Sequence, residues 1–281
     1  MSLLQLPEIK ADARIGAAQF DMRPEALERW DPCVRAAADD VASISIYEQI
    51  GASWDGSGIT ASRISGILRS LGARDIVVNV NSPGGDFFEG VAIYNLLRQH
   101  KAKVTVQVMG LAASAASVIA MAGDEILMGE GSFLMIHNAW AVAVGNRHDF
   151  LAASDQLAPF DAAMAEVYAA RSGLSVEEAA AMMDKETWIG ATQAIKDGMA
   201  TGMIDRADMT QDTKAQGGKK YLALVEASMA RAGHSRSVRR DALKSLFSGM
   251  PGAAENSIMP SAGQEVAASL ELLLNNLKGT K

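Results

Sequence analysis

Ser114 and His137 have the side chains that serine hydrolases use, and each follows a stretch that is predicted to be a strand. Ser114 comes after the alternating run at residues 104–108 and after Gly110, and it precedes Ala- and Ser-rich residues typical of a tightly packed helix. A serine at such a turn lies beside free backbone N–H groups and the positive end of the helix dipole. Attack on an acyl carbonyl needs that environment, because negative charge develops on the carbonyl oxygen. Small residues at a helix–sheet contact produce the same pattern, so the stretch alone leaves both interpretations open.

His137 is the best candidate for a general base among the four histidines. It directly follows the apolar run FLMI at residues 133–136, so we expect it to project from the end of a strand. His100 is expected at the surface, and His148 and His234 lie in polar or basic segments. A single histidine after a strand is more often structural than catalytic, and that alternative stays open.

Serine-dependent acyl transfer also needs an acid that orients the base, and donors that stabilise the oxyanion. Asp184 and Glu186 in MMDKETW are candidates for the acid, with ordinary helix-end carboxylates as the alternative. Gly84 and Gly85 follow a buried strand and can present a backbone N–H to a substrate carbonyl. A tight turn and a weak phosphate-binding loop are the alternative interpretations, although the Lys-Ser or Lys-Thr ending and the GxGxxG pattern of a true phosphate loop are absent.

The elements that must position these residues alternate between strand and helix patterns. We expect, in order, a strand at 41–50, a helix at 59–71, a strand at 76–80, a helix at 88–100, the strand and helix around Ser114, and strands at 125–128 and 133–136. Beyond these lie an extended arm or hairpin at 139–148 and helices at 150–171, 175–183 and 187–198, the second of which starts with the capping-box pattern SVEE at 175–178. This spacing predicts an α/β fold with a mostly parallel sheet covered by helices.

Composition excludes several classes of protein and site. The chain has 281 residues, 49% of them hydrophobic, and its formal net charge of −7 argues against a nucleic-acid binder. Cys33 is the only cysteine, so an internal disulfide and a cysteine zinc site are excluded. We recognise no signal peptide or membrane span, and we expect a cytoplasmic protein with no membrane partner, metal or cofactor.

Charge and texture divide the chain into three predicted parts. Residues 206–281 carry 11 Lys and Arg against 7 Asp and Glu, whereas the rest of the chain is acidic. We therefore expect an N-terminal extension at 1–40, a catalytic domain at 41–206, and a basic, partly helical tail at 207–281. Within the tail we expect amphipathic helices at 221–232 and 266–277, separated by a flexible linker at 250–263.

Three stretches resemble, in their order, the Clp protease proteolytic subunit (ClpP) family. They read VNSPGG (80–85), GLAAS (110–114) and MIH (135–137), and the resemblance covers roughly residues 42–206. It implies a ClpP/crotonase-like fold with a protruding handle. By position, the resemblance makes Ser114 the nucleophile and His137 the general base, and the backbone N–H groups of Gly85 and Ala115 the oxyanion hole.

The resemblance is weakest at the third catalytic residue. The family has an aspartate shortly before an E-A-V-x-x-G-like helix, which here reads QAIKDG (193–198), and the matching position holds Glu186. Glutamate is one methylene longer than aspartate, so Asp184 is the substitute candidate. Ser117 is a weaker alternative to Ser114 as nucleophile.

Within the family, the longer stretches are most similar to phage ClpP-related head maturation (prohead) proteases. These stretches are SPGGDFFEGVAIYNLLRQHK, GLAASAASVIAMAGDE, FLMIHNAWAVAVGNRHD and MMDKETWIGATQAI. This similarity implies an ATP-independent serine endopeptidase that cleaves capsid and scaffold proteins inside the assembling prohead, in the host cytoplasm. It also implies a ring-type homo-oligomer joined through the handle, and makes the tail a candidate for portal or capsid contacts.

Three other functions stay open. The first is a housekeeping ClpP-like peptidase that receives its substrates from an unfoldase. Stimulation of peptide cleavage by an unfoldase and ATP would favour it, although we recognise no element in residues 1–40 that would dock an unfoldase. The oxyanion glycines also suit a crotonase-type enzyme that binds acyl-CoA. Finally, residues 207–281 suit a scaffold-like assembly module.

Overall fold

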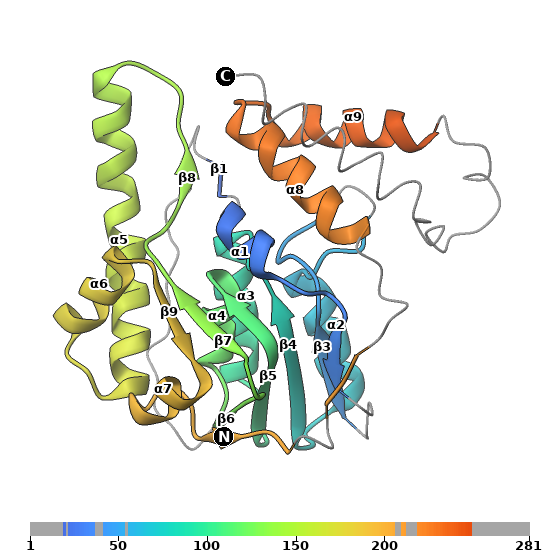
Figure 1. The fold of residues 1–281 in the computed structure, drawn as a ribbon, viewed down its shortest axis with the longest axis vertical. Helices are drawn as coiled ribbons and strands as arrows, with labels where there is room; N and C mark the ends of the chain where they lie inside the picture. The colour runs from blue at the N-terminus through green and yellow to red at the C-terminus, as the bar shows by residue number, and fades with distance from the viewer. Residues whose placement is uncertain are drawn as a thin grey trace.

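The computed structural model describes residues 19–20, 22–36, 42–53, 56–205, 209–211 and 218–248, and a seven-stranded sheet forms its centre (Figure 1). Five parallel strands lie in the order β10-β6-β5-β4-β3: Gly202–Met203, Glu125–Met128, Val104–Ala113, Ile76–Ser82 and Ser43–Ile46. β7 (Phe133–Ile136) pairs in parallel with the far half of β5, and β9 (Thr187–Gly190) pairs antiparallel with β7. The predicted α/β fold with a mostly parallel sheet is confirmed.

Apolar strands and capped helices explain why the sheet forms where it does. Val78, Val80 and Val106 are fully buried, as expected for parallel strands covered on both faces. The helices α2 (Ala61–Leu71), α3 (Phe87–Arg98) and α4 (Ala115–Ala120) separate successive strands. The Thr60 side chain caps α2, and the Asp86 carboxylate caps α3 by accepting hydrogen bonds from two backbone N–H groups.

Three sequence-based boundaries were wrong. The predicted break at Gly110 is absent, because β5 continues to Ala113 through a register shift in its pairing with β4. β4 likewise continues two residues beyond the predicted end, to Ser82. The predicted helix at 187–198 begins only with α7 (Ala191–Lys196), since Thr187–Gly190 pair with β7 as β9.

An arm extends from the sheet beyond β7. It consists of β8 (Ala141–Val142) and the long helix α5 (Arg147–Ser172), which rises past the sheet in Figure 1. α5 and the following α6 (Val176–Asp184) both begin with capping boxes, the second of which was predicted. A short N-terminal strand, β1 (Gln19–Phe20), pairs antiparallel with β8.

Segments from both ends of the chain pack together on the sheet. α1 (Pro24–Arg29) contacts α8 (Gly218–Arg231), and α9 (Arg236–Ser248) follows α8; the strands β2 (Val34–Ala36) and β11 (Met209–Gln211) pair antiparallel. Apolar side chains of α1, α8 and α9 form one cluster with residues of β5 and β7. The division into three parts remains a prediction, and the predicted linker at 250–263 and helix at 266–277 lie outside the described residues.

Two further observations concern the described part of the chain. No described helix has the length and hydropathy needed to cross a bilayer, and no group of three or more metal-ligating side chains lies among the described residues.

His100, expected at the surface, is 8% exposed, and its Nε2 lies 2.7 Å from the Arg74 carbonyl oxygen.

Candidate active site

Ser114 occupies a sharp turn between β5 and α4. Its backbone has φ 55° and ψ −127°, an unfavourable conformation for a residue with a side chain. The Ser114 N–H donates to the Met135 carbonyl oxygen at 2.9 Å, which holds the turn against β7. Strain of this kind persists only when the surrounding structure enforces it, and it is concentrated at functional sites.

The pairing of β5 with β7 brings His137 to Ser114. Ala113 is the register partner of Met135, so the next residues of the two strands emerge at the same edge of the sheet. Both Ser114 and His137 line one small pocket, together with Trp140 from the arm and Met164 from α5. The sequence-predicted nucleophile and base therefore lie at one site.

Two glycines shape the loop on the other side of this pocket. A Cβ on Gly84 would lie 2.6 Å from the Ala113 carbonyl oxygen, so only glycine allows this close approach to the Ser114 turn. Ile50 bonds the residues on both sides of Gly85: its N–H donates to the Gly84 oxygen, and its oxygen accepts from Asp86. In a parallel bridge the N–H of the central residue faces the opposite side. The Gly85 N–H therefore faces away from Ile50, and Gly85 lines the same pocket as Ser114.

Ala115 and Ser117 have different positions in α4. Ala115 is the first residue of the helix, where backbone N–H groups have no partner within the helix, and it lines the pocket. Ser117 is fully buried; its hydroxyl donates to the Ser114 oxygen at 2.6 Å and lies 2.8 Å from the Tyr168 hydroxyl. Ser117 thus stabilises the turn and is not accessible as a nucleophile.

The two candidate acids have different neighbours. Ile136 pairs with Thr187 in the antiparallel β7–β9 ladder, so the backbone of Glu186 lies opposite His137. The Glu186 carboxylate forms an ion pair with Arg23. Asp184 instead accepts a hydrogen bond from the Asn138 side chain at 2.7 Å. The register therefore favours Glu186 as the acid near His137.

Burial and charge determine the protonation of His137. Its side chain is 5% exposed, and Nε2 has no hydrogen-bond partner among the described residues. Burial, followed by the positive charge of Arg23, lowers the pKa of His137 to about 4, against the opposing effect of Glu186. The imidazole is neutral at pH 7, as a general base must be.

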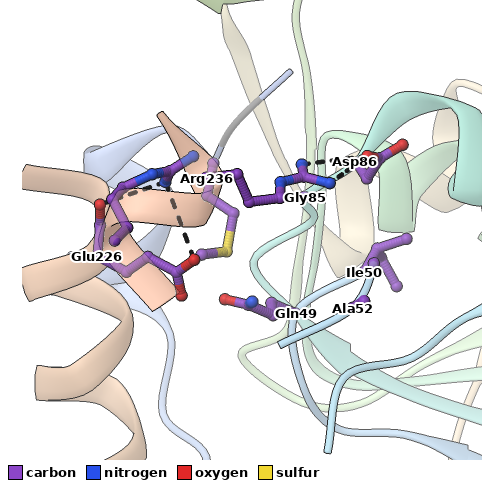
Figure 2. Close-up of a pocket in the computed structure, with 10 residues that line it drawn as sticks. Gln49, Ile50, Ala52, Gly85, Asp86, Glu226 and Arg236 are labelled. Carbon is purple, nitrogen blue, oxygen red and sulfur yellow. Dashed lines mark hydrogen bonds and ion pairs between the residues drawn. The ribbon is translucent and has the colours of Figure 1, made fainter. Parts of the chain in front are cut away.

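The loop that contains Gly85 is also held from its other side (Figure 2). Arg236 of α9 contacts the Asp86 carboxylate through two nitrogens, each at 3.2 Å, and Arg240 donates to the Ala52 oxygen. Neither Arg236 nor Arg23 is recognisable from the sequence, because each lies outside any motif and more than 100 positions from its partner.

Comparison with known proteins gives one family. A family model described as Clp protease matches residues 56–207. The relatives include the ATP-dependent Clp protease proteolytic subunit 2 of Rhodococcus jostii, 31% identical over 48% of this chain and 70% of that protein. The ATP-dependent Clp protease proteolytic subunit of Deinococcus radiodurans is 29% identical over 47% of this chain and 66% of its own length.

The matches to these relatives cover about two thirds of their length. Among solved structures, a ClpP1 mutant from Listeria monocytogenes has a TM-score of 0.49 and 22% identity. That likeness covers 59% of this chain and 93% of the Listeria chain.

Proposed function

The chain belongs to the Clp protease family, and we propose that it is a serine peptidase that hydrolyses peptide bonds through an acyl-enzyme. One observation carries this proposal: Ser114, Ala115, His137 and Gly85 line the same pocket, although they come from three separate parts of the chain. Nucleophile, base and oxyanion donors are the parts that acyl transfer requires.

In the proposed reaction, the Ser114 hydroxyl attacks the substrate carbonyl while His137 Nε2 accepts its proton. The resulting oxyanion accepts hydrogen bonds from the N–H groups of Gly85 and Ala115, and the leaving amine takes the proton from His137. Water then attacks the acyl-enzyme by the same route and releases Ser114. The buried Nε2 without a partner is consistent with this role for His137.

Glu186 is the proposed acid that orients His137, since its backbone lies opposite the histidine. Glu186 also raises the pKa of His137, as a carboxylate beside an imidazole does. Asp184 is the substitute candidate. Asp184 contacts Asn138, the residue after His137, so it would act on His137 only through that neighbour.

For the natural substrates we propose capsid and scaffold proteins, cleaved without ATP during phage head maturation inside the prohead. The support is the resemblance of the stretches around Gly85, Ser114, His137 and Glu186 to prohead proteases. The relatives that match carry the name ATP-dependent Clp protease proteolytic subunit, and this favours the second candidate, a housekeeping peptidase that works with an unfoldase.

Self-association into a ring through the arm is part of both proposals. Val144, Phe150 and Leu151 are 78%, 52% and 57% exposed and lie within eight positions of one another, and exposed apolar side chains that gather in a patch mark interaction surfaces. The tail beyond residue 206 is the proposed site of portal or capsid contacts.

Labelling with a fluorophosphonate tests the proposed nucleophile. We expect the wild type to gain one phosphonyl group by intact-mass measurement and Ser114→Ala to gain none. Ser117→Ala is the matched control: it removes a nearby hydroxyl, and we expect it to label normally despite lower stability. Labelling of Ser114→Ala would refute the role of Ser114, and acyl-CoA binding without any labelling would support the crotonase-type alternative.

Cleavage assays with purified proteins distinguish the two functions. With capsid and scaffold proteins as substrates, we expect cleavage by the wild type and none by Ser114→Ala in the absence of ATP and of any unfoldase. Cleavage of peptides that rises only with an unfoldase and ATP would instead establish the housekeeping function.

A further inference from the structure

The strand β8 leads directly out of the candidate active site, and a segment of the same chain occupies its edge. Trp140 lines the pocket and immediately precedes β8. β1 lies antiparallel to β8, with Gln19 opposite Val142 and Phe20 opposite Ala141 (Figure 1). A free strand edge is a binding site for extended polypeptide, because its N–H and C=O groups can pair with any backbone.

Arg23, three residues after β1, contacts residues of the candidate active site. It forms the ion pair with Glu186, and its guanidinium lies 5.9 Å from the centre of the Trp140 ring. The Arg23 side chain is only 19% exposed. One residue of the N-terminal segment therefore contacts both the candidate acid and a wall of the pocket.

This contact opposes the proposed chemistry in two ways. The Glu186 carboxylate is paired with Arg23 at the position from which it would orient His137. The positive charge of Arg23 also disfavours the imidazolium that forms when His137 takes the proton of Ser114. Both effects reduce the capacity of His137 to act as a base.

We propose that β1 and Arg23 block the active site in cis. β1 occupies the β8 edge that an extended polypeptide would use, and Arg23 withholds Glu186 from His137. The inference rests on the proposed serine-peptidase function. A substrate strand, or assembly with further copies, must displace β1 before the site becomes fully active.

The blocking segment has an anchor that does not depend on its contacts at the site. Leu27 and Trp30 are buried in the cluster with α8, and the Trp30 indole N–H donates to the Asn81 carbonyl oxygen at 3.0 Å. Residues 24–30 therefore stay attached to the sheet when Arg23 is replaced. Replacement of Arg23 tests release of the site and not loss of the fold.

The first test compares Arg23→Gln with Arg29→Gln by the rate of fluorophosphonate labelling. Arg29 is the matched control, because it also belongs to this segment and stacks on an aromatic ring, that of Trp188 at 4.1 Å. We expect Arg23→Gln to label about tenfold faster than the wild type, which is a partial release of the roughly 10²–10⁴-fold that a general base contributes, and Arg29→Gln to label at the wild-type rate. Equal or slower labelling of Arg23→Gln beside a reactive wild type would refute the blocking role and leave the peptidase proposal intact.

If neither the wild type nor Arg23→Gln labels, the peptidase proposal itself fails, and the inference fails with it. Labelling of Arg23→Gln alone supports both. The thermal unfolding midpoint of all three proteins is measured together with the labelling rate. This measurement separates slow labelling caused by loss of the fold from slow labelling of a folded protein.

The second test locks β1 in place. Gln19→Cys and Val142→Cys are combined in a Cys33→Ser background, because these positions are register partners and Cys33 is the only native cysteine. We expect the oxidised protein to label more slowly than the same protein after reduction, and each single-cysteine protein to be insensitive to oxidation. Equal rates in the two states, or failure of the disulfide to form under oxidant, would show that β1 does not block the site from the β8 edge.

Discussion

Arg23 and Glu186 form an ion pair at the point where the backbone of Glu186 lies opposite His137 in the β7–β9 ladder. The two residues are 163 positions apart in the sequence. Arg23 thus places a positive charge near His137, the proposed base. It also forms an ion pair with Glu186, the carboxylate that the family resemblance makes the third catalytic residue.

Replacement of Arg23 by glutamine should raise the pKa of His137 above its present value of about 4. The reason is that a nearby positive charge is lost while the raising effect of Glu186 remains. The imidazole signals of selectively labelled protein, followed by NMR during a pH titration, provide the measurement. Arg29→Gln should leave the titration unchanged, and an unchanged curve for Arg23→Gln would contradict the assigned electrostatics.

His137 should make the folded protein less stable in acid. The unfolded chain protonates this imidazole below its ordinary pKa of 6.5, whereas the folded protein does so only near 4. Protons therefore favour the unfolded state, and the free energy of unfolding should fall as the pH falls from 6.5 to 4, by roughly 3 kcal/mol from this group. Denaturant unfolding of wild type and His137→Asn across that range isolates the effect, because carboxylates titrate in both. Parallel curves for the two proteins would rule it out.

Gly85→Ala should destabilise the protein far more than Gly131→Ala. Both glycines have positive φ, at 143° and 77°, but a Cβ on Gly85 would lie 2.2 Å from the Ile50 oxygen, and a Cβ on Gly131 would contact nothing within 4 Å. The conformational cost alone predicts a loss of about 1–2 kcal/mol for Gly131→Ala. The added clash predicts about 3 kcal/mol or more for Gly85→Ala, with loss of fluorophosphonate labelling. Similar unfolding midpoints for the two variants would be inconsistent with the described loop.

Arg236→Gln should reduce kcat for peptide hydrolysis with little change in KM. Arg236 is a positioning residue: it holds Asp86, which follows Gly85 and caps α3, and it is not in contact with the Ser114 pocket. Loosening this loop weakens a donor that acts mainly in the transition state. The matched control is Arg231→Gln, which removes an exposed arginine that lies 3.8 Å from Glu25. A fall in kcat of the same size in both variants would show a general loss of stability instead.

The sequence predicted correctly those features that depend on local residue patterns and on the order of neighbouring strands. Alternating strand and helix patterns require a parallel sheet, and the ends of parallel strands meet at one edge. The family resemblance implied that the VNSPGG turn, Ser114 and His137 act together, and Gly85, Ser114 and His137 line one pocket at such an edge. The capping box at Ser175 was predicted for a similar reason, since its hydrogen bonds are local.

Only the tertiary structure decided the features that depend on partners distant in the sequence. Thr187–Gly190 form a strand because they pair with the edge of β7. Their own residue pattern does not distinguish a strand from the start of a helix. The partners of Arg23 and Arg236 depend on how both ends of the chain fold back over the sheet. Sequence alone therefore predicted which residues serve as nucleophile, base and acid, whereas long-range packing decided which charges surround them, because a charge acts through distance in space and not along the chain.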